Sequence, residues 1–396
     1  DHVIHVRCFP EHQVNADKPA QVVYALGDPC RQCRRPAACR PRVRVRGRPR
    51  LGYHYPAGSD SVGRQARSGA DHRQVREGVG CQKSEVRLKP EAGEHIPLHP
   101  ILTVGSVAFD SIKTPFGEAS RVVGGAATYF SVAASFFTDV RLVAVVGDDF
   151  TEEQMRVFSG RRIDLTGLQR VPGETFRWKG EYSVDFNSRE TIYTHLNVFD
   201  QFRPVLPESY RSTPFVFLAN IHPALQLEVL DQVHAPRFVA ADTMNYWIEG
   251  TPGELRKVLG RVDALVINDE EARELSGESN LVKAARAIQR MGPALLVIKR
   301  GEHGVLVTRD RFFAAPAMPL EEGVDPTGAG DSFVGAMVGY LAKTGGLVDA
   351  NIRKAILYGS VVASFCCEGF GLNRTTKTTR SEINQRLRAL EKMTRA

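Results

Sequence analysis

Residues 325–333 read Asp-Pro-Thr-Gly-Ala-Gly-Asp-Ser-Phe, and the rest of the chain is organised around this stretch. It precedes a helical pattern whose apolar residues recur at helical spacing: Phe333, Met337, Tyr340 and Leu341. We expect Thr327 to cap this helix, with Gly328-Ala329-Gly330 as its first turn. A helix start offers unpaired backbone N–H groups and the positive end of the helix dipole. The stretch therefore predicts an anion site.

Asp331 places a carboxylate beside that expected anion site. A carboxylate repels a phosphate, so the pairing makes little sense for binding alone. It does suit a general base that takes the proton of the group attacking the phosphate. The alternative is a first-turn acid that only complements the helix dipole.

The nine-residue string resembles the C-terminal motif of the ribokinase-like (PfkB) family of sugar and nucleoside kinases. The resemblance extends from about Ile101 to Leu390. It implies an α/β fold, a three-layer sandwich with a mostly parallel central sheet, helices on both faces and a small β lid. It also implies that Asp331 is the general base, and that backbone N–H groups of Gly328, Ala329 and Gly330 stabilise the transferred phosphoryl group.

Strand-like and helix-like segments alternate after Ile101, which independently indicates a mostly parallel sheet with helices on both faces. We expect a kinase domain over 99–394, with lid segments near 111–123 and 174–200. Residues 176–183 and 191–196 alternate as a strand pair would, with Arg177 and His195 as candidate lid contacts. An edge hairpin without a catalytic part is the alternative. A lid of this kind could close alone or pair two subunits in a homodimer.

The candidate acceptor site follows the first strand of this domain, residues 101–106. Asp110 comes after that strand, where open α/β sheets place ligand contacts. Gly124-Gly125 then allows a close backbone approach before a helix. The resemblance implies that Asp110 binds substrate hydroxyls and that the glycines hold the acceptor. Tyr129 stands where these kinases usually carry an Asn, which suggests a different acceptor shape.

The candidate donor and metal sites lie further along the chain. Asn268 and Glu271 have the spacing of a helix-capping pair, and the resemblance implies that they position hydrated Mg²⁺. For ATP, the resemblance implies contacts at the residues Lys299, Gly301, Gly304, Thr327, Gly359 and Ser360. Relatives commonly carry an Asn where Gly359 or Ser360 stands. A monovalent cation such as K⁺ near Asp325 is a further expectation from the family.

The predicted function is ATP-dependent phosphorylation of a hydroxymethyl group on a small sugar. One alternative is a purine nucleoside acceptor of the adenosine type, whose base Tyr129 could stack on. A non-catalytic binding protein on the same fold is the other, but it predicts loss of Asp331, which is present.

The first 98 residues differ from the rest of the chain. Residues 1–100 hold 18 Lys and Arg against 10 Asp and Glu, whereas the other 296 hold 34 against 35. The sequence of these residues is rich in Arg, Pro and Gly, and its apolar residues show neither helical nor strand periodicity. It predicts a basic leader that is disordered or arises from a misplaced start. Residues 42–50 could form a basic strand, and Cys30, Cys33 and Cys39 could bind zinc, but neither pattern is complete. We therefore expect no nucleic-acid partner.

Cysteines are sparse after residue 100, where only Cys366 and Cys367 occur. This favours a reducing cytoplasm. The sequence contains no run of eighteen apolar residues, so we expect no membrane partner.

Overall fold

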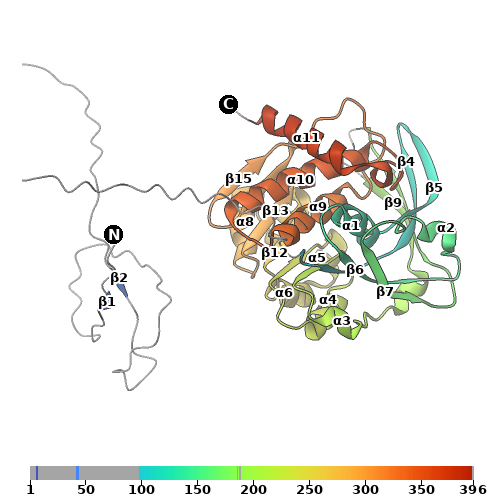
Figure 1. Cartoon of the computed structure of the whole chain (residues 1–396), viewed down its shortest axis with the longest axis horizontal. Helices are drawn as coiled ribbons and strands as arrows, with labels where there is room; N and C mark the ends of the chain where they lie inside the picture. The colour runs from blue at the N-terminus through green and yellow to red at the C-terminus, as the bar shows by residue number, and fades with distance from the viewer. Residues whose placement is uncertain (1–5, 8–41, 44–97, 185, 187–188, 395–396) are drawn as a thin grey trace, which may run out of the picture. The chain divides into compact units, whose positions relative to one another are not determined.

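The computed structural model describes residues 6–7, 42–43, 98–184, 186 and 189–394 (Figure 1). The chain divides into two units, residues 1–88 and residues 89–396. In the first unit, β1 (Val6–Arg7) pairs antiparallel with β2 (Arg42–Val43). The basic strand expected over 42–50 is thus described only at its first two residues. Cys30, Cys33 and Cys39 lie outside the described residues, as does nearly all of the expected leader.

The second unit contains a nine-stranded sheet in the order β15-β14-β13-β12-β11-β10-β3-β6-β7. Its strands are β3 (Ile101–Val104), β6 (Val140–Val146), β7 (Ile163–Arg170), β10 (Phe215–Leu218), β11 (Phe238–Ala241), β12 (Ala264–Asn268), β13 (Leu295–Lys299), β14 (Val305–Thr308) and β15 (Phe312–Ala315). Pairing is parallel from β13 to β7, whereas β14 and β15 pair antiparallel at one edge. The predicted mostly parallel sheet is confirmed.

Helices cover both faces of this sheet. In β10, Val216 and Leu218 pack toward α4, α6 and α8, whereas Phe215 and Phe217 pack toward α1, α9 and α10. The helices are α1 (Ala126–Ser135), α2 (Glu152–Met155), α3 (Glu208–Arg211), α4 (Pro223–Gln232), α5 (Asn245–Gly250), α6 (Pro252–Leu259), α7 (Asp269–Ser276), α8 (Leu281–Gln289), α9 (Ala329–Thr344), α10 (Asp349–Cys367) and α11 (Arg380–Met393). Short 3₁₀ turns are η1 (Asn197–Gln201), η2 (Gly301–His303) and η3 (Thr375–Lys377). Within the described part of the chain, no helix is long and apolar enough to cross a membrane.

A second, four-stranded sheet stands apart from the large one, in the order β5-β4-β8-β9 (Figure 1). Its strands are β4 (Ala108–Thr114), β5 (Gly117–Gly124), β8 (Phe176–Tyr182) and β9 (Arg189–His195). The predicted small β sheet is therefore present, and we refer to these four strands as the lid. Arg177 forms ion pairs with Asp149 and Glu174, and the His195 ring lies 4.7 Å from the Tyr193 ring.

The start of α9 differs by one residue from the prediction. The cap is Gly328 rather than Thr327, because Gly328 adopts the left-handed region with φ of 76°, which glycine enters without cost. Thr327 instead donates its backbone N–H to Asp325 Oδ1, at 2.8 Å. The carboxyl ends of the parallel strands and the start of α9 together position the site.

Candidate active site

The N-terminus of α9 forms a cradle without obstructing side chains. A Cβ at Gly328 would lie 2.3 Å from the Tyr129 ring, and one at Gly330 would lie 3.0 Å from Lys299 Nζ. Ala329 donates its N–H to the Pro326 carbonyl at 3.1 Å. The predicted donor role of Ala329 stays a prediction, and in this conformation that N–H already has an acceptor. Within the described residues, the amides of Gly328 and Gly330 have no backbone acceptor, so both suit an anion.

Asp331 lies in the first turn of α9, half-buried beside this cradle. Burial raises the pKa of its carboxyl to about 8, and the negative charge of Asp242 adds to this. The Lys299 ammonium acts in the opposite direction. A carboxyl with a pKa near neutrality can accept a proton and later release it, as a general base must.

Asp110 is the buried acid of β4, and burial raises its pKa to about 7. The two glycines that follow β5 make room for it. A Cβ at Gly124 would lie 1.9 Å from Asp110 Oδ2, while the Gly125 N–H donates a hydrogen bond to this carboxylate. Gly125 has φ of 92°, a region that other residues rarely adopt. The structure thus brings Asp110, Gly124 and Gly125 together, and their contact with an acceptor stays a prediction.

Tyr129 occupies a different environment from the one predicted. Its side chain is 1% exposed and lies beneath Gly328, packed with Val132, Cys366 and Leu372. A base cannot stack on a ring whose face is covered by the cradle. The prediction that Tyr129 stacks on an acceptor base is therefore wrong for this structure, and the residue supports the cradle from below.

Asn268 and Glu271 form a reciprocal capping box at the start of α7. Glu271 donates its N–H to Asn268 Oδ1 at 2.7 Å, and Asn268 donates its N–H to Glu271 Oε2 at 2.8 Å. Burial, and then the charge of Asp242, raise the pKa of Glu271 to about 7. Glu271 therefore faces the same group of carboxylates as Asp331. Among the described residues, no three His, Cys, Asp or Glu side chains converge closely enough to hold a metal alone.

Lys299 is the cation within this group of carboxylates. Its Nζ lies 3.9 Å from Asp242 Oδ2, and the two side chains are 20% and 8% exposed. Burial lowers the pKa of Lys299, but Asp242, Glu271 and Asp331 outweigh burial and raise it. The amine therefore stays charged beside Gly330, at the mouth of the cradle.

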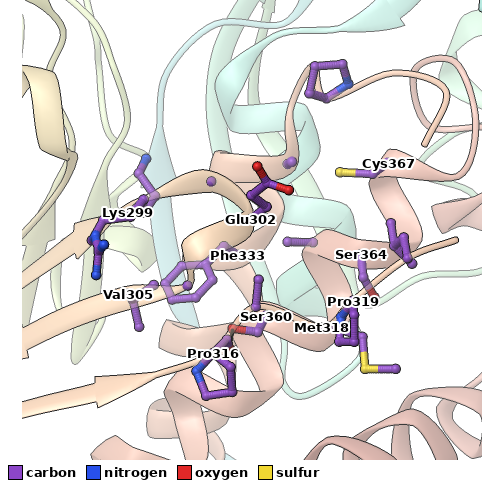
Figure 2. Close-up of a pocket in the computed structure, with 18 of the residues that line it drawn as sticks. Lys299, Glu302, Val305, Pro316, Met318, Pro319, Phe333, Ser360, Ser364 and Cys367 are labelled. Carbon is purple, nitrogen blue, oxygen red and sulfur yellow. Dashed lines mark hydrogen bonds between the residues drawn. The ribbon is translucent and has the colours of Figure 1, made fainter. Parts of the chain in front are cut away.

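A cavity of about 680 Å³ adjoins the cradle (Figure 2). Figure 2 shows Lys299 at one end and Met318 and Pro319 at the other. Four of the predicted ATP contacts line this cavity: Lys299, Gly301, Gly304 and Ser360. Most of its other lining residues are apolar.

Two of the predicted ATP contacts do not line the cavity. A Cβ at Gly359 would lie 2.8 Å from the Phe333 ring, so this glycine makes room for Phe333 instead. Thr327 donates its hydroxyl hydrogen to the Tyr182 hydroxyl at 3.2 Å, which turns it toward the lid. Both oxygens of the Asp325 carboxylate accept backbone N–H groups, from Thr327 and Gly371. The expected monovalent cation near Asp325 stays a prediction.

Sequence reasoning missed three residues that the fold brings to the site. Asp242 follows β11, Tyr182 reaches Thr327 from the lid, and Arg189 is the register partner of Tyr182 on β9. The positive charge of Arg189 lowers the pKa of Asp110, Glu271 and Asp331 from the values that burial alone would give. The sequence does offer a signal for Asp242, because this acid directly follows a buried strand. The place of Arg189 in the site depends on strand register, which the sequence does not show.

A cradle for an anion, a neighbouring carboxyl with a raised pKa and a cavity for a ligand are the features expected of a kinase that phosphorylates a hydroxyl group. A family profile described as pfkB family carbohydrate kinase matches residues 98–379. The chain belongs to this family.

Individual relatives agree with that assignment. The chain is 32% identical over 248 residues to a cytidine kinase from Thermococcus kodakarensis, a match that covers 61% of this chain and 87% of the relative. Among solved structures, a Burkholderia thailandensis nucleoside kinase in complex with inosine has a TM-score of 0.60 at 21% identity, covering 73% and 96% of the two chains. A ribokinase-type protein from E. coli, in complex with ATP and Mg²⁺, has a TM-score of 0.62 at 19% identity, covering 74% and 100%. These two structures share the fold.

Proposed function

We propose that this protein uses ATP and Mg²⁺ to phosphorylate the hydroxymethyl group of a small sugar or of the sugar moiety of a nucleoside. The observation that carries the proposal is the position of Asp331 beside the anion cradle of α9, with its pKa raised to about 8. A carboxylate beside an anion cradle is explained if it removes the proton from the hydroxyl group of the acceptor.

The donor nucleotide fits the cavity and the cradle. The cavity of about 680 Å³ is lined by Gly330, Lys299 and Ser360, and so joins an apolar pocket to the cradle. The backbone N–H groups of Gly328 and Gly330 would bind the transferred phosphoryl group, and Lys299 would hold phosphate oxygens as a point charge. Thr327 and Gly359 would support this site without lining it.

Mg²⁺ fits the group of carboxylates around Lys299, which comprises Asp242, Glu271 and Asp331. Asn268 and Glu271 would hold it mostly through water, because no three His, Cys, Asp or Glu side chains of the described region form a metal cage. Bound in this way, the ion supplies positive charge that lowers the repulsion between the donor phosphates and an attacking oxygen. Burial, and then the negative charge of Asp242, raise the pKa of Glu271 to about 7, and a divalent cation would offset that second contribution.

The protein's own residues would carry the remaining steps. Asp110 would accept hydrogen bonds from acceptor hydroxyls, with Gly124 and Gly125 keeping the backbone close to the acceptor. Asp331 would take the proton from the hydroxymethyl oxygen as that oxygen attacks. The lid would exclude water, since Tyr182 already closes onto Thr327 through a 3.2 Å hydrogen bond.

The experiment that tests this proposal identifies the product. The full chain would be incubated with ATP, Mg²⁺ and a panel of pentoses, hexoses and ribonucleosides, and the phosphate ester located by ³¹P NMR. The proposal expects a stoichiometric ester on a hydroxymethyl carbon. An ester on a ring hydroxyl, or ATP cleavage to phosphate without any ester, would contradict it.

A further inference from the structure

The inner surface of the lid is identified by its contacts with the large unit. Thr114 donates its hydroxyl hydrogen to the Val324 carbonyl at 2.9 Å, and Tyr182 receives one from Thr327. Side chains at alternate positions of a strand share a face. The face of β8 that carries Tyr182 therefore also carries Trp178, two strand repeats earlier. Trp178 pairs in register with Asp110 of β4, so the two share this inner face.

Trp178 is a half-buried tryptophan whose indole is held in place by Gly180, Thr191 and Arg189. Its indole lies over Gly180, where a Cβ would come within 2.2 Å of the ring. The indole Nε1 donates to Thr191 Oγ1 at 3.4 Å, and the Arg189 guanidinium lies 5.3 Å from the ring centre. Within the described residues, Trp178 belongs to none of the hydrophobic clusters. The ring is thus held flat without being needed for a core.

The inner face of the lid is wider than Asp110 alone would need to bind sugar hydroxyls. From Asp110 on β4 across Trp178 on β8 to Thr194 on β9, the inner face spans two strand spacings, on the order of 10 Å. Thr191 and Thr194 are exposed there. A free pentose presents mostly hydroxyls and has no flat π surface to place on an indole. A nucleobase matches an aromatic face next to guanidinium donors.

We infer that Trp178 is the base-stacking wall of the acceptor site, and that the acceptor is a ribonucleoside rather than a free sugar. This inference rests on the proposed function. Asp110 would hold the ribose hydroxyls, and the base would lie along the indole, with Arg189 donating to a carbonyl oxygen or ring nitrogen of the base. An exposed cation–π contact is weaker than the stacking of a base. A bound base can therefore displace the Arg189 guanidinium from part of the Trp178 ring.

The chain offers a direct optical test, because its only tryptophans are Trp178 and Trp247. Trp247→Phe leaves Trp178 as the sole tryptophan reporter. With saturating ADP filling the donor cavity, cytidine and adenosine should quench its emission, whereas D-ribose should not. Trp178→Phe, which retains only Trp247, should show no nucleoside-dependent change. Equal quenching by ribose, or none by any nucleoside, would overturn the inference.

Kinetics give a second, independent readout. Trp178→Ala should raise the KM for a nucleoside roughly 5- to 150-fold, the loss typical of one stacked base, with the KM for ATP unchanged. Gly180→Ala should act in the same direction, because its Cβ displaces the indole. Gly253→Ala is the matched control, since a Cβ there meets nothing within 4 Å. An unchanged nucleoside KM in both Trp178→Ala and Gly180→Ala would contradict the inference.

Failure of the inference and failure of the proposed function give different results. In Asp331→Asn, nucleoside quenching of Trp178 should persist while transfer is lost. Quenching in a parent protein that phosphorylates nothing would support the stacking wall and refute the kinase reaction. Phosphorylation of ribose in preference to nucleosides would support the kinase reaction and refute the stacking wall.

Discussion

Replacing Lys299 by Met tests whether the Lys299–Asp242 pair holds the phosphate end of the site together. The two charged atoms lie 3.9 Å apart and both side chains are mostly buried. At an effective dielectric constant of about 20, that separation corresponds to an attraction of about 4 kcal/mol. Lys299→Met leaves the Asp242 carboxylate buried among Glu271 and Asp331. We therefore expect a loss of about 3–4 kcal/mol in the free energy of unfolding.

The double variant makes the test specific. In Lys299→Met/Asp242→Asn, the buried Asp242 charge nearest to the lost ammonium is also removed, so we expect at least about 2 kcal/mol of the lost free energy to return. Asp242→Asn alone should cost less than Lys299→Met, because Glu271 and Asp331 still face the ammonium. Guanidinium denaturation of the four proteins measures the coupling as shifts of midpoint at constant slope. Strict additivity of the two single effects would contradict this expectation, since it would mean that Lys299 and Asp242 do not interact.

Three further outcomes follow from the site. The parent kcat/KM should rise with pH through the Asp331 pKa of about 8, and Asp242→Asn should move this midpoint to lower pH by removing a like charge, as a pH–rate profile would show. Gly328→Ala should lower kcat about 100-fold in a steady-state assay, because position 328 has φ of 76° and an added Cβ would clash with the Tyr129 ring. The ligand-free protein should lose stability as pH rises from about 4 to about 8, because the folded Asp331 carboxyl binds its proton more tightly than the unfolded one; Asp331→Asn should flatten this part of a Tm-versus-pH curve.

The sequence predicted the fold through periodicity and one long motif. Strands such as Val140–Val146 are buried on both faces and bounded by turn residues, so they are visible without a structure. β7 (Ile163–Arg170) was missed because it is an edge strand, where polar and apolar residues mix. The start of α9 was displaced by one residue because Thr327 is a good cap, but the left-handed Gly328 satisfies the turn instead.

The candidate site could be predicted only where its residues share a motif. Asp331, Gly328 and Gly330 are neighbours in sequence, and Asp110 pairs with a recognisable glycine turn. Local sequence does not reveal that Gly359 faces Phe333 or that Tyr129 lies under Gly328, because both depend on how helices pack. Arg189 and Trp178 enter the site through strand register, which no local pattern specifies.

The central claim is that Asp331 is the base of a phosphoryl transfer, and one comparison tests it most directly. Asp349 is also a first-turn acid, at the start of α10, and is exposed. If a first-turn acid only complements a helix dipole, Asp331→Asn and Asp349→Asn should have similarly small effects. If Asp331 is the base, Asp331→Asn should lower kcat by about 10²- to 10⁴-fold with ATP still bound, while Asp349→Asn should leave kcat unchanged. An Asp331→Asn protein that retained most of its kcat would contradict the account.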